Sequence, residues 1–211
     1  CKGTCWMSKN LIIIGARAMG RETCNYARDS GFIVKGFLDS DSSILNGFVG
    51  YPPVIATVEG YLPADDEVFI CAIGDPCVKK HYVRLMEAKG AKFVSVIHPS
   101  AYVGPNVVIG EGSIISVNVT LTCDIKIGCH VIVNVNSTIS HDCFVGDFSS
   151  ISPGCSIAGR VSLDEKVFLG VGVKVIPDIS LGAEISVGAG AVITKSWKSG
   201  ILVGVPACLK K

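Results

Sequence analysis

Apolar and polar positions follow two different periods along the 211-residue chain. In the first part, continuous apolar runs alternate with stretches of helical spacing. The apolar runs are NLIIIGA, FIVKGFLDSD, EVFICAIGD and AKFVSVIHP, and the helical stretches are MGRETCNYARDSG and PCVKKHYVRLMEAKG. An apolar run without alternation is typical of a strand buried on both faces. Strands alternating with helices predict parallel strands joined by right-handed crossovers, so residues 9–96 are expected to form a short α/β domain.

From Ile97 onward the apolar period becomes six residues. Every sixth position from Ile97 to Ile193 is aliphatic, without a break, and glycine often follows it. A six-residue period is the signature of a solenoid of parallel strands. Three repeats make one triangular coil, so residues eighteen apart stack at about one strand spacing, ~4.8 Å. Residues 97–211 are therefore predicted to form a parallel β-helix of about five coils, with the aliphatic side chains inside and a tail at the end.

The charge of the chain is nearly balanced, with 19 basic and 18 acidic residues. A nucleic-acid-binding protein would carry a clear basic excess, so no nucleic-acid partner is expected. The strongest charge run, Lys79–Lys80, is interpreted as a solvated helix face.

No apolar run is long enough to span a bilayer. Residues 1–8 include a plausible start at Met7. They are interpreted as a leader or expression remnant.

Ten cysteines are scattered without the spacing of a disulfide framework. The chain is long enough to build a core without such bonds. We therefore expect reduced thiols in a cytoplasmic protein, most of them small buried fillers, with Cys143 and Cys155 inside the solenoid.

A glycine-rich turn, GARAMG, lies between the first strand and the first helix of a Rossmann-like domain. Such glycines let backbone N–H groups approach a phosphate at the helix N-terminus. The dinucleotide fingerprint would need glycine where Arg17 stands, which disfavours NAD. Asp39 and Gly74 end two further strands at the same edge, where ribose and base contacts are usual. Gly15, Arg17, Asp39 and Gly74 are candidate substrate-binding residues; the alternative is that the glycines only permit tight turns.

One histidine, His141, follows the inward Ile139 by two residues, so it is predicted to lie near a corner and point outward. Such a residue is either an ordinary surface histidine or a general base. The next residue, Asp142, is placed to orient the ring and stabilise the imidazolium. The eighteen-residue spacing puts Asp124 and Arg160 in the column of Asp142, where Arg160 would favour the ionised carboxylate and Asp124 would oppose it.

A zinc site built from Cys123, Cys129, His130, His141 and Cys143 is disfavoured. The spacing lacks a close CxxC pair, and Cys143 is expected to point inward. His130 is interpreted as an interface or surface residue, because no acid adjoins it. No metal is predicted.

The segments IIIGARAMGRE, ISHDCFVGD and GVPA together resemble one family, that of the sialic acid O-acetyltransferases and bacillosamine-pathway N-acetyltransferases, which are left-handed β-helix enzymes. The resemblance runs from Lys9 to Ala207. It implies a homotrimer with active sites between neighbouring solenoids and acetyl transfer from acetyl-CoA to a sugar in glycan biosynthesis. In relatives of the bacillosamine pathway the acceptor is a 4-amino-4,6-dideoxy sugar linked to a nucleotide, which the amino-terminal domain holds.

The resemblance also implies roles for particular residues. His141 and Asp142 match the family's His–acid pair, with the histidine as general base for direct attack of the acceptor on the thioester. Acetyl-CoA contacts fall on Ser150, Val171 and Ala189.

The chain departs from the family pattern at three positions. Ser150 and Met19 stand where relatives often carry histidine, and Cys208 follows GVPA in place of the usual lysine. For the oxyanion, a backbone N–H near Gly159 or Gly170 is the expected donor.

Three functions remain open at this point. The first is N-acetylation of an amino sugar linked to UDP, dTDP or GDP, and the second is O-acetylation of a sialic acid or related sugar. The third belongs to another class, a non-catalytic trimeric binding or assembly protein.

Overall fold

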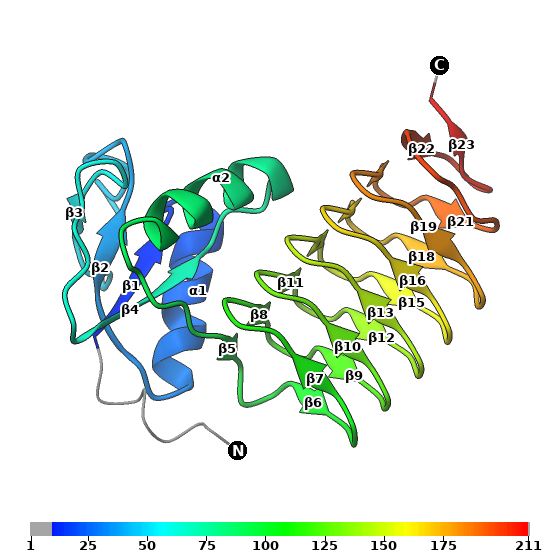
Figure 1. Cartoon of the computed structure of the whole chain (residues 1–211), viewed down its shortest axis with the longest axis horizontal. Coiled ribbons are helices and arrows are strands. Elements are labelled where there is room, and N and C mark those ends of the chain that lie inside the picture. Colours follow the sequence, from blue (N-terminus) through cyan, green and yellow to red (C-terminus); the bar gives the residue numbers. More distant parts are fainter. Residues whose placement is uncertain (1–9, 211) are drawn as a thin grey trace.

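A computed structural model describes residues 10–210 of the chain. These residues form an amino-terminal α/β domain followed by a long parallel β-solenoid (Figure 1). The expected leader or expression remnant, residues 1–8, lies outside the described residues. Neither helix in the described part has the length and apolar character needed to cross a membrane.

The amino-terminal domain is built on a parallel sheet with the strand order β3–β2–β1–β4. The bounds are β1 Asn10–Ile14, β2 Ile33–Leu38, β3 Val54–Ala56 and β4 Glu67–Cys71. Strands β1 and β4 are almost wholly buried, as continuous apolar runs predict. Strand β3 was not predicted, because it has only three residues and follows two prolines, which weaken any strand signal.

Two helices pack on this sheet, α1 (Ala18–Asp29) and α2 (Pro76–Glu87). The start of α2 is strongly specified, because the Asp75 carboxylate accepts hydrogen bonds from two backbone N–H groups of the first turn and proline occupies the first helical position. The last predicted run, AKFVSVIHP, adds no full strand to this sheet. Phe93 makes an isolated bridge to Phe69, and the run ends in the first strand of the solenoid.

The solenoid strands from β5 to β21 have two residues each and begin at Val96, one residue before the expected boundary. They form three sheets, which we call sheet 1 (β5, β8, β11, β14, β17, β20, then β22 and β23), sheet 2 (β6, β9, β12, β15, β18, β21) and sheet 3 (β7, β10, β13, β16, β19). Their bounds are β5 Val96–Ile97, β6 Tyr102–Val103, β7 Val108–Ile109, β8 Ile114–Ile115, β9 Thr120–Leu121, β10 Lys126–Ile127, β11 Ile132–Val133, β12 Thr138–Ile139, β13 Phe144–Val145, β14 Ser150–Ile151, β15 Ser156–Ile157, β16 Ser162–Leu163, β17 Phe168–Leu169, β18 Lys174–Val175, β19 Ser180–Leu181, β20 Ser186–Val187, β21 Val192–Ile193, β22 Ile201–Val203 and β23 Cys208–Leu209.

The predicted inward positions fill the prism. From Ile115 to Ile193 every sixth residue is at most 3% exposed. Ile97 and Val103, in the first coil, are 37% and 38% exposed because they lie at the end of the stack. Cys143 and Cys155 are buried as predicted, and the cysteines of the described part are all free thiols.

Corners of the prism use the left-handed backbone conformation. Non-glycine residues with φ near +60° recur there, among them Asp124, Asp142 and Arg160. Asparagine and aspartate tolerate this conformation better than most residues. At Asp142 this conformation turns the chain from one face of the prism to the next. Because His141 directly precedes the turn, the turn determines where the imidazole lies.

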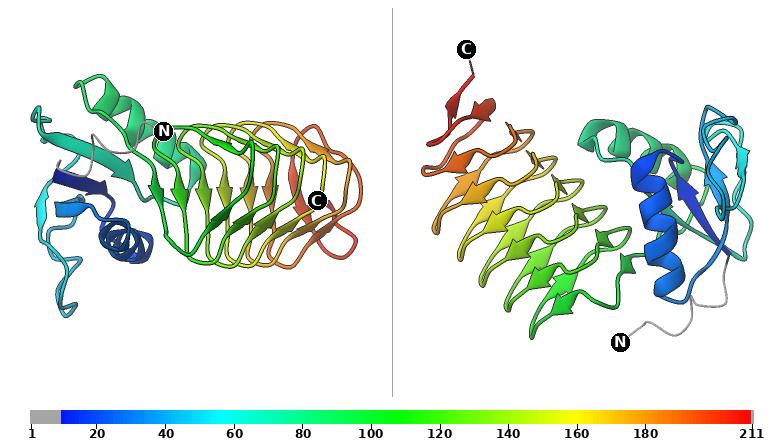
Figure 2. Two further views of the ribbon diagram at one scale, coloured as in Figure 1. Left: turned by 90° about the horizontal axis from the view of Figure 1, so that it is seen from below. Right: turned by 180° about the vertical axis from the view of Figure 1, so that it is seen from behind.

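The amino-terminal domain packs on sheet 1. The first three strands of sheet 1 each contribute one outward residue to a buried apolar cluster. These residues are Val96, Ile114 and Ile132, and they pack with Leu11 and Tyr26 of the amino-terminal domain. The helix α1 lies beside these first coils, and α2 reaches over the next ones (Figure 2). The domains therefore share a core.

One sequence prediction fails at this interface. Lys79 is wholly buried, so Lys79–Lys80 is not a solvated helix face. His130 takes the first of its two expected positions, an interface, and is 2% exposed there: its ring stacks on Phe148 and meets Phe93 edge-on. Burial lowers the pKa of His130 to about 4, so this histidine is neutral. The sequence could not reveal either burial, because each depends on the second domain covering the site.

Candidate active site

The His141–Asp142 pair lies at the corner between β12 of sheet 2 and β13 of sheet 3. The ring Nδ1 is 2.7 Å from Asp142 Oδ2, and the two side chains are 47% and 56% exposed. Within residues 10–210 the other ring nitrogen, Nε2, has no hydrogen-bond partner. The bond to Asp142 can therefore hold the tautomer of His141 that carries its proton on Nδ1, while Nε2 faces an incoming group. The predicted outward position of His141 is correct.

Gly159 stacks one coil beyond His141 and leaves room for its ring. A Cβ atom built on Gly159 would lie 2.5 Å from both Nε2 and Cε1 of His141. No real side chain tolerates this distance, so the imidazole can occupy its position only over a glycine. The backbone N–H of Gly159 also has no hydrogen-bond acceptor within the described residues, whereas the N–H of Gly170 donates to Val187 O at 2.8 Å.

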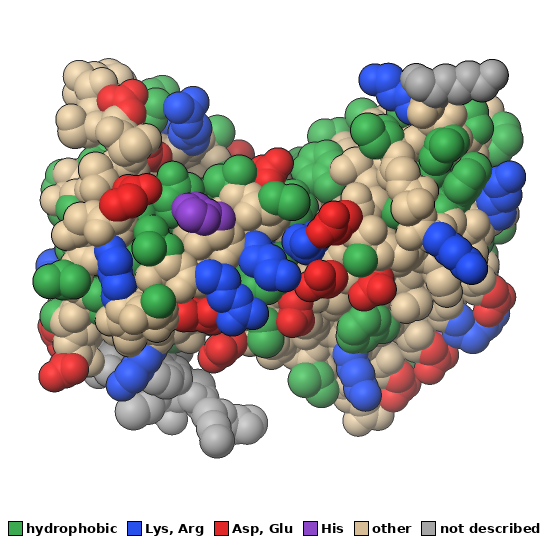
Figure 3. Space-filling view, turned by 45° about the horizontal axis from the view of Figure 1, so that its top comes forward, with side chains coloured by type: hydrophobic (Ala, Val, Ile, Leu, Met, Phe, Trp, Pro, Cys, Tyr) green, Lys and Arg blue, Asp and Glu red, His purple; other side chains and the backbone are tan. Residues whose placement is uncertain are grey.

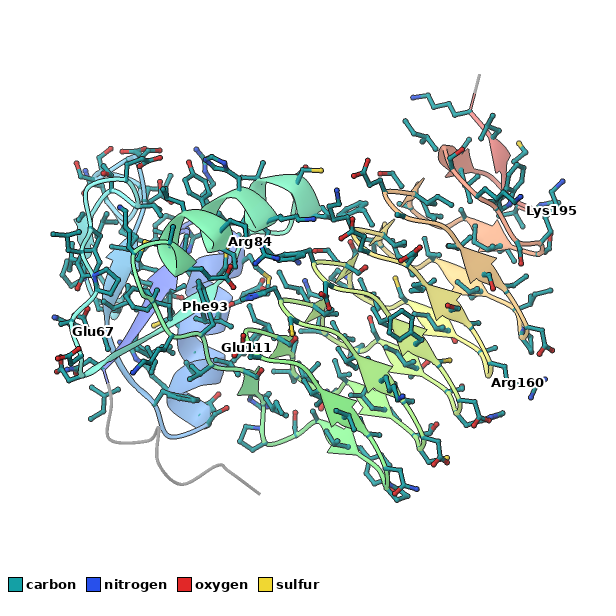
Figure 4. All side chains as sticks on the ribbon, viewed as in Figure 1. Glu67, Arg84, Phe93, Glu111, Arg160 and Lys195 are labelled. Carbon is teal, nitrogen blue, oxygen red and sulfur yellow. The ribbon has the colours of Figure 1, made fainter. Side chains whose placement is uncertain are left out.

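Arg160 lies one coil beyond Asp142, in the predicted column, but its hydrogen bonds go to another carboxylate. Its guanidinium forms a bidentate ion pair with Asp178, one coil further on, at 2.6 and 2.9 Å. Hydrogen bonds from Arg160 lower the pKa of Asp178. One coil before the site, Asp124 accepts a hydrogen bond from Asn106 instead. Figure 4 shows Arg160 on the edge of the solenoid opposite to α2.

The family resemblance implies that three residues contact acetyl-CoA, and these residues lie in two different places. Val171 and Ala189 are exposed and stack one above the other at the corner between sheets 1 and 2, where Gly190 N donates to Val171 O. Ser150 is only 4% exposed and lies on β14 under the amino-terminal domain. Its hydroxyl accepts a hydrogen bond from Lys79 Nζ at 2.8 Å. Lys79 is a residue that sequence reasoning missed.

All four predicted substrate-binding residues line one cavity in the amino-terminal domain, with a volume of about 280 Å³. It lies at the carboxyl ends of β1, β2 and β4, the edge expected for a nucleotide. The rest of its lining comes from the flanking strands, turns and α2, namely Ile14, Met19, Leu38, Ser40, Val58, Ala72, Ile73, Val78 and Tyr82.

Asp39 has a structural role that the sequence did not reveal. Its Oδ2 accepts a hydrogen bond from Ala16 N at 2.9 Å, and its Oδ1 accepts one from Asp41 N at 3.1 Å. The carboxylate thereby holds the turn after β1, where Gly15 has a φ of 92°. At the N-cap of α1, Arg17 makes no capping bond with its side chain. The N–H groups of Gly15 and Ala16 are bonded within the domain, to Leu38 O and to Asp39, so the N–H groups that α1 can offer to the cavity are those of its first turn.

Acidic and basic side chains gather where α2 meets the solenoid (Figure 3). They include Lys80, which is 3.3 Å from Glu165. No group of histidine, cysteine and acidic side chains among residues 10–210 has an arrangement that would hold a metal ion.

A hexapeptide solenoid with an outward His–Asp pair, joined to an α/β domain with a nucleotide-sized cavity, defines the class of solenoid acetyltransferases. Residues 10–86 match the family model of the PglD N-terminal domain. The structure of PerB from Caulobacter crescentus, solved with CoA and GDP-perosamine, is 32% identical, with a TM-score of 0.86 over 96% of this chain and 97% of that one. The chain therefore belongs to the PglD and PerB family of amino-sugar N-acetyltransferases.

Two other proteins support this placement. The acetyltransferase domain of PglB from Neisseria gonorrhoeae FA1090, also solved in complex with acetyl coenzyme A, is 29% identical, with a TM-score of 0.88 over 96% of this chain and 100% of that one. UDP-N-acetylbacillosamine N-acetyltransferase of Bacillus subtilis (strain 168) is 31% identical over 114 residues, 51% of each chain, so the match spans about half of that relative.

The contact between Gly159 and His141 predicts a non-additive effect on stability. Gly159→Ala should displace the half-exposed His141 ring and lower the free energy of unfolding by about 1 kcal/mol, the lower end of the range for overpacking. In a His141→Ala background the same change should have little effect, because the ring that it strikes is gone. Denaturant unfolding of the four proteins measures the coupling. An equal loss in both backgrounds would show that Gly159 is needed for another reason.

Proposed function

We propose that this chain transfers an acetyl group from acetyl-CoA to the amine of a nucleotide-linked 4-amino-4,6-dideoxy sugar. The observation that carries the proposal is the His141–Asp142 pair with its free Nε2, in a chain that matches PerB across both domains. PerB was solved with CoA and a GDP-linked sugar, and one PglB structure holds acetyl-CoA. A cytoplasmic location fits the free thiols.

His141 acts as general base in this proposal. As the acceptor nitrogen attacks the thioester carbonyl, Nε2 takes the proton that the amine must lose. Asp142, bonded to Nδ1, orients the ring and stabilises the imidazolium. The tetrahedral intermediate then expels the CoA thiolate, which receives the proton from His141. Of the two expected oxyanion donors, the N–H of Gly159 is favoured, because that of Gly170 is already bonded within the solenoid.

The sugar nucleotide belongs in the cavity of the amino-terminal domain. Its phosphates would meet Gly15, Arg17 and the start of α1, and Asp39 and Gly74 lie at the base and ribose end. UDP, dTDP and GDP all remain candidates for the nucleotide.

The proposed reaction needs more than one copy of the chain. The nucleotide cavity lies over sheet 1, whereas His141 lies at the corner between sheets 2 and 3, on the far side of the prism. The proposed acetyl-CoA residues, Val171 and Ala189, occupy a third place, the corner between sheets 1 and 2. A homotrimer brings these together, with the His141 corner of one copy facing the cavity and the CoA corner of its neighbours.

Exposed apolar residues support such an assembly. Tyr102 on sheet 2 and Val108 and Phe144 on sheet 3 are 58%, 60% and 43% exposed. They lie on the two faces that meet at the His141 corner. Exposed large apolar side chains also occur elsewhere on the described residues, so these three are compatible with a protein interface there but do not by themselves define one.

Replacing the proposed base should separate chemistry from binding. We expect His141→Ala to lower kcat by ~10²–10⁴-fold, the usual contribution of a positioned general base. Asp142→Asn should lower it less, since it removes only the charge. Binding of CoA and of nucleotide should persist in both, because the side chains point away from the core. A near-wild-type kcat for His141→Ala at pH 7 would make this imidazole a surface residue.

The nucleotide can be identified by thermal shift with UDP, dTDP, GDP and CMP sugars, with and without CoA. One of the first three should raise the unfolding temperature, because a ligand stabilises the folded state that it binds. Ser40→Trp is the matched control: it fills the cavity from an exposed lining position and should abolish the shift while CoA binding remains. Stabilisation by the CMP sugar alone would point to O-acetylation of a sialic acid.

Mixing two inactive chains tests whether the site lies between copies. Ser40→Trp blocks the cavity and His141→Ala removes the base, so each homotrimer alone should be inactive. Co-refolding equal amounts should restore about a quarter of the wild-type sites, if each site takes its cavity and its base from different copies. No recovery in trimers shown by mass to be mixed would place both parts in one copy.

A further inference from the structure

Lys79 of α2 is a wholly buried lysine at the boundary between the two domains. Its Nζ donates to the hydroxyl of Ser150 at 2.8 Å and to the carbonyl oxygen of Ser149 at 3.1 Å, both in the solenoid. The neighbouring Lys80 is a third exposed and forms an ordinary ion pair with Glu165. Two adjacent lysines of one helix therefore have quite different environments.

The hydrogen bonds of Lys79 fit a neutral amine. A neutral amine has two N–H groups and finds two acceptors here, whereas an ammonium would bury a third N–H without one. Neither acceptor is a carboxylate. The titratable groups that face Lys79 are Cys71 of β4, Asp75 at the N-cap of α2 and His130 of the solenoid. Burial lowers the pKa of Lys79 to about 7.

Lys79 contacts the solenoid three strands of sheet 1 beyond its first strand, and the Lys80–Glu165 ion pair lies further along still. The chain enters the solenoid at Val96, and the outward residues that follow along sheet 1 are Ile114, Ile132 and Ser150. Three strand spacings, ~14 Å, separate the first from the last. The contacts at the near end combine an apolar cluster with a hydrogen bond from Ser30 Oγ to the carbonyl oxygen of Ile97, at 2.8 Å. The bonds of Lys79 are directional and act about three coils away from that end, where a small rotation of the domain produces a larger displacement.

The helix that carries Lys79 also forms part of the nucleotide cavity. Val78 and Tyr82 line it, and Gly74 lies in the turn just before α2. A change in the position of α2 relative to β14 therefore moves the cavity wall and the bound sugar together.

We propose that Lys79 is a positioning residue that holds the nucleotide cavity at one fixed distance and angle from the solenoid. In this role it sets where the sugar amine stands relative to the His141 of a neighbouring copy. The inference rests on the proposed function. Buried polar contacts of this kind select one arrangement among several that apolar packing alone would permit.

The test compares Lys79→Met with Lys80→Met, a matched change at the next residue. Lys79→Met keeps an unbranched side chain, one atom shorter than lysine, and removes both hydrogen bonds. It should lower kcat by ~10–100-fold, the effect of a misplacement of about 1 Å, while the Kd values of nucleotide and CoA stay as in the wild type. Lys80→Met should behave as the wild type, since an exposed ion pair contributes little. A folded Lys79→Met trimer with wild-type kcat would overturn the inference.

Two measurements that need no activity accompany this comparison. The stability of the wild type relative to Lys79→Met should increase as the pH rises from about 7 towards 10, because the unfolded wild-type chain then binds a proton that folded Lys79 does not. Lys79→Met should lose this part of the pH dependence. The buried thiols, whose pKa values burial raises, act in the opposite direction but equally in both proteins. Amide hydrogen exchange in α2 should be faster in Lys79→Met than in Lys80→Met. Equal exchange in the two variants would contradict the positioning role.

These readouts also separate the inference from the proposed function. If the wild type acetylates none of the nucleotide sugars, the proposed function fails, and the exchange of α2 alone decides whether Lys79 holds the domain. If Lys79→Met does not fold, Ser150→Ala removes one acceptor from the solenoid side and should also lower kcat at unchanged CoA affinity. A weaker CoA affinity with unchanged kcat would instead make Ser150 a CoA contact and overturn the inference.

Discussion

Each coil of the solenoid is hydrogen-bonded to the next through short parallel strands, and this stacking holds the rest of the molecule in place. Residues eighteen apart pair directly, as Thr138 does with Ser156 and Ile139 with Ile157. The stacking makes the inward column a continuous core and turns the outward columns into fixed rows on three faces and three corners. His141 has a defined position because it belongs to such a corner, above Gly159.

The second constraint is the way in which the amino-terminal domain covers sheet 1. Apolar residues of the first three coils join the core of that domain, and the corner residue Phe148 packs with Val83 and Met86 of α2. Lys79 is hydrogen-bonded to the solenoid, and the His130 ring stacks on Phe148, although its buried Nδ1 has no hydrogen-bond partner within the described residues. The directional bonds of Lys79 and the ring stacking favour one orientation of the domain.

The two constraints together separate the parts of the proposed site. Stacking puts His141 at the corner between sheets 2 and 3, and the Val171–Ala189 pair at the corner between sheets 1 and 2. Domain packing puts the nucleotide cavity on the side of sheet 1, which borders the second of these corners but not the first. The prism is a solid core with no passage through it. In the proposed function, chemistry that uses all three parts takes place between copies, and the exposed apolar side chains on sheets 2 and 3 are compatible with such an interface.

By itself, the sequence determined what depends on local period and on short-range geometry. The inward aliphatic column and the outward corner position of His141 beside Asp142 follow from spacing, because a strict repeat makes distant residues neighbours by a simple rule. The edge shared by Gly15, Asp39 and Gly74 follows from alternating strands and helices, because the carboxyl ends of parallel strands lie at one edge of a sheet. Tertiary structure alone decided the burial of Lys79, Ser150 and His130, and the pairing of Arg160 with Asp178. Burial depends on which surface a second domain covers, and the choice of an ion-pair partner depends on side-chain direction at a corner; neither leaves a periodic trace in the chain.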